Sequence, residues 1–318
     1  MNAPVKLTAF AVTLTVLFGG GALAGGAVGP ERAPRSEAHD ADAAGRGDRA
    51  RGAGAEHTSE ATGADGGSES AAGHGAARTA RPVRGLAVAE NGLRLVLADS
   101  ELRRGRTETA RFRIVGEQGR TVRDFDVEHT KRMHLIVVRR DLTGFQHLHP
   151  RMRADGTWSL PLRLQEAGSY RVFADFSHQD RAATLASDLR VDGSAALEPL
   201  PSARPTAASD GGYQVQLDAG EPGAGQEADL RFTITKDGRR VQTEPYLGAG
   251  GHLVALREGD LAFLHVHPTE GAHGGAKAAD DDAVGFMSTF PTTGTYRLFL
   301  QFKHEGRVQT AAFTTEVK

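Results

Sequence analysis

The stretch HLIVVRRDLTGFQHLHP, residues 134–150, occurs a second time as HLVALREGDLAFLHVHP, residues 252–268, with 7 identities in 17 ungapped positions. A second pair of blocks, GSYRVFADFSH at 168–178 and GTYRLFLQFKH at 294–304, follows in the same order with 6 identities in 11 positions. The blocks are short, often alternate apolar and polar residues, and end at Gly, Asp or Pro, which is typical of antiparallel strands. The sequence therefore predicts a tandem duplication of an all-β domain.

The repeats have the size of immunoglobulin-like β-sandwiches, which are about 100 residues long. We therefore predict one sandwich at residues 85–192, a Pro/Ala/Ser-rich linker at 193–211 and a second sandwich at 212–318. The apolar and glycine positions that both repeats share are expected to lie in the cores and at the corners: Phe145/Phe263, Gly168/Gly294, Tyr170/Tyr296, Phe173/Phe299 and Phe176/Phe302.

The chain before the first repeat is expected to direct the protein out of the cytoplasm. Residues 7–28 form an uncharged, mainly apolar run that is long enough to span a bilayer as a helix. The small residues at 22–24 also fit a signal-peptide cleavage site, so residues 1–30 are predicted to be a signal anchor or a signal peptide. Residues 31–84 contain almost no large apolar side chain and are predicted to form a disordered tether.

The composition excludes several kinds of function. The 38 basic and 40 acidic side chains give a net charge of −2, so no basic excess is present to bind nucleic acid. Cysteine is absent, which excludes disulfides, thiolate zinc sites, iron–sulfur clusters, a cysteine nucleophile and a blue-copper centre. The chain has no nucleophile-elbow, P-loop or dinucleotide-binding motif, and no acidic residue that both repeats place beside their histidines. An enzyme is therefore not expected.

Eight of the 13 histidines fall at matching positions of the two repeats: His134/His252, His147/His265, His149/His267 and His178/His304. Residues i and i+2 of a strand point to the same face at a separation of roughly 6.5–7 Å, which a metal ion can bridge. A tight hairpin centred at 140–141, or at 258–259, would place His134 opposite His147 and His252 opposite His265. Each repeat is therefore predicted to hold its own three-histidine metal site.

The remaining candidate ligands depend on the fold. His178 or His304 becomes a fourth ligand where its strand neighbours the hairpin, and Met133 adds a soft ligand for Cu(I) that the second repeat lacks, since Gly251 stands there. Imidazole must be neutral to bind a metal and its unperturbed pKa is near 6.5, so binding is expected to weaken below about pH 6. The alternative is that the histidines are structural and hydrogen-bond to the backbone.

The closing blocks resemble a known group of domains. Gly168–His178 and Gly294–His304, the latter followed by Ala312–Val317, are similar to the last two strands of the extracytoplasmic copper-handling CopC-like and YtkA/FixH-like sandwiches. The anchored, tandem, His-x-His-Pro arrangement resembles actinobacterial envelope proteins described as heavy-metal-binding. CopC-like proteins carry an Asp-Gly-His near the position of His178 and His304, and the Asp-Gly is missing here. The resemblance implies copper, whereas the spacing of the histidines suits zinc as well.

Two functions from different classes follow from these patterns. The first is an extracytoplasmic metal-binding protein for copper carriage, buffering or resistance, with a membrane contact through its N-terminal helix and other envelope metal-handling proteins as partners. The second is a cell-envelope interaction module of two immunoglobulin-like domains that binds no metal. Two ions per chain would support the first function, and a folded protein that takes up no metal would support the second.

Overall fold

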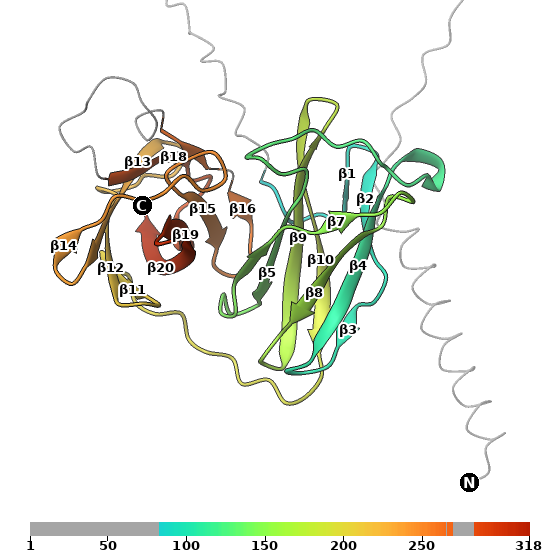
Figure 1. The fold of residues 1–318 in the computed structure, drawn as a ribbon, viewed down its shortest axis with the longest axis horizontal. Coiled ribbons are helices and arrows are strands. Elements are labelled where there is room, and N and C mark those ends of the chain that lie inside the picture. The colour runs from blue at the N-terminus through green and yellow to red at the C-terminus, as the bar shows by residue number, and fades with distance from the viewer. Residues whose placement is uncertain (1–82, 265, 270–282) are drawn as a thin grey trace, which may run out of the picture. The chain divides into compact units, whose positions relative to one another are not determined.

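The computed structural model describes residues 83–264, 266–269 and 283–318 (Figure 1). The predicted signal segment at 1–30 and nearly all of the predicted tether lie outside these residues. Within them, two tandem β-sandwich repeats are present, which confirms the predicted all-β fold. No helix in this part of the chain is long and apolar enough to cross a membrane.

The first repeat consists of two five-stranded sheets (Figure 1). One sheet has the order β1 (Ala89–Glu90), β2 (Leu93–Leu97), β4 (Thr107–Val115), β8 (Trp158–Arg163) and β7 (Arg151–Met152). The other has the order β3 (Glu101–Leu102), β10 (Arg181–Val191), β9 (Gly168–His178), β5 (His134–Arg139) and β6 (Gln146–Leu148). A single 3-10 turn, η1 (Glu117–Gly119), follows β4.

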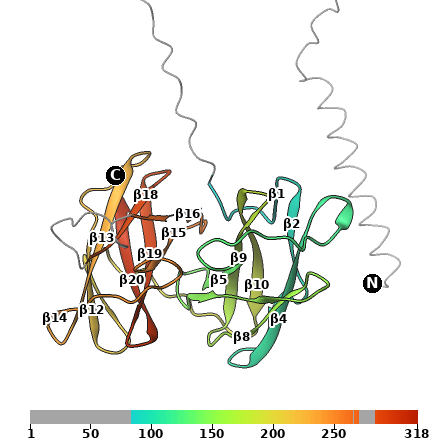
Figure 2. The same cartoon turned by 45° about the horizontal axis from the view of Figure 1, so that its top comes forward.

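The second repeat has the same plan. Its six-stranded sheet has the order β11 (Thr206–Ser209), β12 (Tyr213–Asp218), β13 (Glu227–Lys236), β18 (Ala283–Thr289) and β17 (His267–Pro268), with β14 (Arg239–Arg240) also paired to β13. Its four-stranded sheet has the order β16 (Phe263–Leu264), β15 (His252–Arg257), β19 (Gly294–His304) and β20 (Arg307–Val317). β11 lies within the predicted linker and pairs with β12, so the second repeat begins before residue 212. A second view shows the long hairpins β9–β10 and β19–β20 (Figure 2).

Each sandwich encloses an apolar core between its two sheets. In the first repeat, Trp158 of β8 and Val137 of β5 belong to one buried cluster, and in the second repeat Phe232 of β13 and Ala255 of β15 belong to another. Alternate residues of each strand supply these contacts, because side chains on a strand point to opposite faces. The period-two pattern of the sequence therefore describes the inner faces of both sandwiches.

Two shared tyrosines form matching corners. The Tyr170 hydroxyl donates a hydrogen bond to the Glu166 carbonyl at 2.9 Å, and the Tyr296 hydroxyl donates to the Thr292 carbonyl at 2.9 Å. A buried tyrosine bonded to the backbone a few residues upstream is a feature of immunoglobulin-like sandwiches. The prediction that these tyrosines are core and corner residues is confirmed.

A third apolar cluster, which we call the seam, joins the two repeats. Ile136 and Val138 of β5 pack in it with Val254 and Leu256 of β15. These side chains occupy the faces of β5 and β15 that point away from the two sandwich cores. Both faces of β5 are therefore covered, which is why all of its residues are buried and why its sequence is a continuous apolar run rather than an alternating one.

Four of the shared phenylalanines lie in the seam and not in the sandwich cores. Phe173, Phe263 and Phe299 belong to this cluster, and the half-buried Phe145 packs against it. The Phe145 and Phe299 rings are stacked with centroids 4.1 Å apart, and the Phe173 and Phe263 centroids are 5.6 Å apart. Their expected place in the cores is corrected: both repeats keep these residues because the repeats use equivalent surfaces to contact each other.

Residues 84–85, which we call the strap, bond to both repeats. Phe263 N donates to the Arg84 carbonyl at 2.9 Å, and Gly85 N donates to the Thr184 carbonyl at 3.1 Å. Gly85 has a φ of +72°, and a Cβ at this position would lie 2.8 Å from Phe173 Cε1 and 2.8 Å from Phe263 Cβ. Only glycine fits here, because the backbone passes against the Phe173 ring and the Phe263 Cβ in a left-handed conformation.

We expect Gly85→Ala to destabilise the protein more than a matched glycine substitution. The φ strain costs about 1–2 kcal/mol, and the clash with two seam rings adds ~1–3 kcal/mol. Gly212→Ala is the control, because Gly212 has a φ of +83° and open space around its Cα. Urea unfolding of both variants measures the difference, and equal losses of stability would show that the strap is not tightly packed.

Candidate metal centre

The pairing of β5 with β6 decides which histidines meet. Ile136 lies opposite His147, so His134 lies level with His149. The predicted pairing of His134 with His147 is therefore wrong by two residues. The second repeat has the same register, with Leu256 opposite Phe263. Because side chains alternate with a period of two, the shift leaves the three histidines of the first repeat on one face.

The turn between β5 and β6 explains the shift. Arg139 N donates to the Thr143 carbonyl at 2.9 Å and Leu142 has a φ of +63°, so the loop is wider than a two-residue turn. The Arg139 guanidinium forms a bidentate pair with Asp141, with distances of 2.9 Å and 2.5 Å. Both side chains are buried, at 2% and 5% exposure. Burial alone would raise the pKa of Asp141, but the hydrogen bonds from Arg139 and Thr143 and from the Glu198 backbone lower it to about 2.

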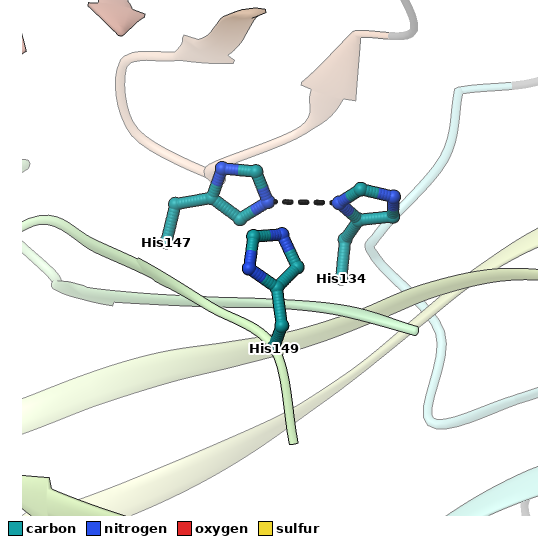
Figure 3. Close-up of side chains that lie close together, drawn as sticks. All are labelled: His134, His147 and His149. Carbon is teal, nitrogen blue, oxygen red and sulfur yellow. Dashed lines mark hydrogen bonds between the residues drawn. The ribbon is translucent and has the colours of Figure 1, made fainter. Parts of the chain in front are cut away.

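Three histidine rings converge at the end of this hairpin (Figure 3). One nitrogen from each of His134, His147 and His149 lies within 4.8 Å of the other two. His134 Nδ1 is 3.0 Å from His147 Nε2. The ring centroid of His149 is 4.8 Å from that of His147 and 5.1 Å from that of His134. Among the described residues, this is the one group of three or more histidine or acidic side chains with mutually close ligand atoms.

The second repeat contributes to the same cluster. The His252 ring is stacked on the His147 ring with centroids 4.6 Å apart, and it lies 5.6 Å from the His134 ring at an interplanar angle of 4°. His147 Nδ1 is 2.7 Å from Oε1 of Gln301, which pairs with His252 across β15 and β19. His252 therefore lies against the histidines of the first repeat, whereas the sequence predicts it in a separate site with His265 and His267, of which His265 lies outside the described residues.

A fifth histidine, which the comparison of the repeats left unmatched, also lies here. The His129 ring centroid is 6.1 Å from that of His134 and 5.8 Å from that of His252. His129 has a φ of +47° in the loop before β5, and the matching loop of the second repeat has Leu247 at +53°. Histidine is enriched at positive φ, but this signal is too weak to identify a ligand. Because the second repeat has no histidine at the matching position, the comparison of the repeats did not identify His129 as part of the site.

The cluster is held neutral by its surroundings. Burial, together with the positive charge that neighbouring rings would carry, lowers the pKa of His147 to about 3 and that of His149 to about 4. Burial also lowers the pKa of His134, and that of His252 falls well below its ordinary value. Neutral imidazole is the form that binds a metal ion. The cluster is therefore ready to act as a set of nitrogen ligands at pH 7.

The hydrogen bonds around the cluster assign its tautomers. The Glu128 carbonyl, 3.2 Å from His134 Nε2, can only accept, so this nitrogen carries the proton and Nδ1 has the lone pair. Gln301 Oε1 likewise accepts from His147 Nδ1, which leaves the lone pair on Nε2. Two lone pairs therefore face each other across 3.0 Å with no proton between them.

A cation would satisfy these nitrogens. Metal–nitrogen bonds of about 2.0–2.1 Å would subtend about 95° across the two facing atoms, close to the angles of four-coordinate sites. His149 Nε2 is buried without a hydrogen-bond partner among the described residues, and an orphaned buried acceptor costs roughly 1–3 kcal/mol. A small inward movement of His149 would complete a three-nitrogen site. The chemistry of the donor set therefore fits a transition-metal ion.

The other predicted ligands lie elsewhere or outside the described residues. His178 Nδ1 bonds to the Asp124 carbonyl at 2.8 Å, and His304 Nδ1 bonds to the Tyr213 hydroxyl at 2.8 Å. Met133 is packed in the core of the first repeat, on the face of β5 opposite the rings. His267 is exposed on β17, which pairs with β18, and His265 lies outside the described residues.

The second repeat has Gly251 at the position that matches Met133, and the surroundings of this glycine give a steric reason. A Cβ at Gly251 would lie 2.9 Å from the Gln301 carbonyl oxygen and 3.1 Å from a methyl group of Val284. Contacts this close are tighter than side chains normally make, so a larger residue would displace β19. Gly251 therefore lets β15 and β19 approach each other beside the cluster, which positions Gln301.

Several solved structures are similar to the chain. The Escherichia coli adhesin FdeC is 14% identical, with 73% of this chain and 66% of that chain covered and a TM-score of 0.25. A Salmonella alpha-2-macroglobulin is 15% identical, with 74% and 15% covered and a TM-score of 0.25. A chimeric titin Z1Z2 tandem is 15% identical, with 71% and 97% covered and a TM-score of 0.18. The chain spans less than two thirds of the first two structures.

The family comparison is more direct. No curated protein matches the sequence. The family described as "Domain of unknown function (DUF8832)" matches twice, at residues 87–193 and at residues 207–318. These matches cover both sandwich repeats and more than half of the chain. The chain therefore belongs to the DUF8832 family, as a tandem pair of its domains.

Proposed function

We propose that the protein binds one copper(II) ion, with zinc as the alternative, at His134, His147 and His149, and that it carries or buffers this metal outside the cytoplasm. The observation that carries the proposal is the 3.0 Å distance between His134 Nδ1 and His147 Nε2, while the other nitrogens of these rings face the Glu128 carbonyl and Gln301 Oε1. A proton between them is disfavoured because burial lowers both pKa values. A metal ion satisfies both nitrogens and His149 Nε2 together.

The ligand chemistry supports the choice of metal. All three ligands are imidazoles, which suit copper, zinc, nickel and iron, and copper(II) binds most strongly among the divalent ions of the series. Met133 is packed in the core of the first repeat, so its thioether does not stand beside the rings to favour Cu(I). The resemblance to CopC-like domains also points to copper. The N-terminal apolar run, which supports an extracytoplasmic location and a membrane anchor, lies outside the described residues.

Carriage rather than catalysis fits the surroundings of the rings. Asp175 is the carboxylate that lies across the strand pair from His134. Its Oδ1 already accepts a hydrogen bond from the Thr184 hydroxyl at 2.6 Å. In metal-dependent hydrolysis, a general base beside the metal-bound water assists its deprotonation, and this carboxylate is already engaged with Thr184. We therefore propose no catalytic role for this protein.

Titration of the metal-free full-length protein with copper(II) and with zinc(II) tests the proposal. We expect one ion per chain at this cluster instead of the two that the repeat pattern predicts, and elemental analysis after dialysis should give the same number. His178→Ala and His304→Ala are matched controls, because these shared histidines bond elsewhere, and both should keep the full stoichiometry. A folded wild-type protein that takes up neither metal would refute the proposal and favour the interaction module.

A further inference from the structure

We infer that the second repeat completes this metal site, with His252 as a fourth ligand and Gln301 as the residue that orients His147, so that a bound ion clamps the two repeats together. The inference rests on the proposed function and adds to it. It assigns to the metal a second role, in which occupancy of the site controls how firmly the two sandwiches are held to each other.

The position of His252 supports a ligand role. It begins β15 in the same way that His134 begins β5, and the two rings lie 5.6 Å apart and almost parallel. Its centroid is 4.6 Å from that of His147, closer than His149 is. His252 lies outside the group of mutually close ligand atoms, so its stacked ring would have to turn to bring a nitrogen to an ion held by the triad. Four imidazoles, three from one repeat and one from the other, match the four-coordinate preference of zinc and suit copper(II).

Gln301 ties the site to the second repeat even without direct ligation. Metal-binding histidines almost always donate their other ring N–H to a carbonyl or carboxylate, which fixes the tautomer and the ring orientation. For His147 this acceptor is Gln301 Oε1 at 2.7 Å, 154 residues away in the chain. Gln301 is itself fixed: it is 7% exposed, and its Nε2 donates to the Thr310 hydroxyl at 3.3 Å. The second repeat therefore decides which His147 nitrogen faces the metal.

The strand pairs β5–β9 and β15–β19 have equivalent registers, but they differ in the residue that pairs with the first histidine. His252 pairs with Gln301 across β15 and β19, and His134 pairs with Asp175 across β5 and β9. The first repeat thus has a carboxylate where the second has an amide. An amide suits the interior of the seam, since it accepts from His147 without bringing in a charge. Because of this difference, the two repeats contribute different groups to the one shared site.

Occupancy of a shared site favours the paired arrangement of the repeats. A ligand shifts an equilibrium between two arrangements only by the ratio of its affinities for them. In the shared site the first repeat contributes three ligands, and the second contributes one ligand and the acceptor that orients His147. Separation of the repeats would remove both contributions of the second repeat. The ion then binds the paired arrangement more tightly, and the seam opens less often when the site is filled.

Affinity and spectroscopy of copper(II) in full-length variants test the ligand roles. His252→Ala should weaken copper(II) binding at least tenfold and reduce the nitrogen superhyperfine pattern in the electron paramagnetic resonance spectrum from four ligands to three. Gln301→Leu should weaken binding roughly 10- to 100-fold, as the loss of an orienting partner does elsewhere. Gln301→Glu should restore affinity, because a carboxylate also accepts from His147 Nδ1. Gln309→Leu, at another buried glutamine of the same sheet, is the matched control and should bind as the wild type does.

Hydrogen exchange with zinc(II) tests the clamp. In the wild type, zinc(II) should slow exchange of the β15 and β19 amides as well as those of β5, whereas in His252→Ala the protection should stay in the first repeat. The Trp158 fluorescence and the far-ultraviolet spectrum check that each variant is folded. If the wild type binds one ion while His252→Ala and Gln301→Leu bind it equally well, with protection confined to the first repeat, the clamp is refuted and the proposed function stands. A wild type that binds no ion refutes both.

Discussion

Replacing His147 and His149 together by alanine is expected to abolish metal binding by the whole protein. His147 and His149 each offer one nitrogen to the three-histidine cluster, which is the one group of this kind among the described residues. His134 and His252 remain in the variant, but they are too few ligands to hold the ion. Isothermal titration with copper(II) and elemental analysis measure the loss, which should take the stoichiometry from one to zero.

The same double variant separates a metal site from a structural one. The matched control, His178→Ala with His304→Ala, removes two shared histidines outside the cluster and should retain the ion. If the histidines of the cluster serve only the fold, each substitution leaves buried partners unpaired at a cost of roughly 1–3 kcal/mol. A large loss of stability in metal-free buffer, together with an unchanged metal stoichiometry of the variant, would contradict the metal-site prediction.

The stability of the metal-free protein is expected to fall steeply as the pH is lowered from 7.5 to 5. The pKa of His147 is lowered to about 3 and that of His149 to about 4, while in the unfolded chain both have pKa values near 6.5. Below pH 6.5 the unfolded chain therefore binds more protons than the folded protein, and the free energy of unfolding falls by up to ~1.4 kcal/mol per pH unit for each group. At pH 5 the two histidines together should account for a loss of about 4 kcal/mol.

Urea unfolding at pH 7.5, 6 and 5 measures this dependence. The His147→Ala, His149→Ala variant is the control, and its stability should depend much less on pH. Equal slopes for the variant and the wild type would show that these histidines are not held neutral. Metal binding to the folded protein should also resist acid further than the unperturbed pKa of imidazole suggests. Protons should compete with the metal at His147 and His149 only when the pH approaches these lowered pKa values. The sequence instead predicts that competition begins below about pH 6.

The duplicated pattern was enough to predict two all-β sandwiches, because inner faces of antiparallel sheets leave a period-two signal in the sequence. It was also enough to mark Tyr170 and Tyr296 as corner residues. It did not show that the repeats contact each other, although the continuous apolar run of β5 indicates a strand that is buried on both faces. Contacts between the two outer faces depend on how whole domains pack, which no local pattern encodes.

The candidate site was predicted in its parts and not in its assembly. The residues His134, His147 and His149 were identified by their spacing, and the even register shift kept them together. The shift itself depends on the Arg139–Asp141 pair and the left-handed Leu142, which fix a wider turn than the sequence suggests. His129 and Gln301 join the site only through a loop conformation and a contact between repeats.

The strap gives the pair of repeats a particular response to tension. Arg84 and Gly85 bond to Phe263 of β16 and Thr184 of β10, so a pull on the chain from its N-terminal side reaches both repeats before it reaches β1. The load is divided between two domains, and the first bonds to break are two backbone hydrogen bonds at the rim of the seam. A protein held at its N-terminal end would thus lose the strap under force while each sandwich kept its fold.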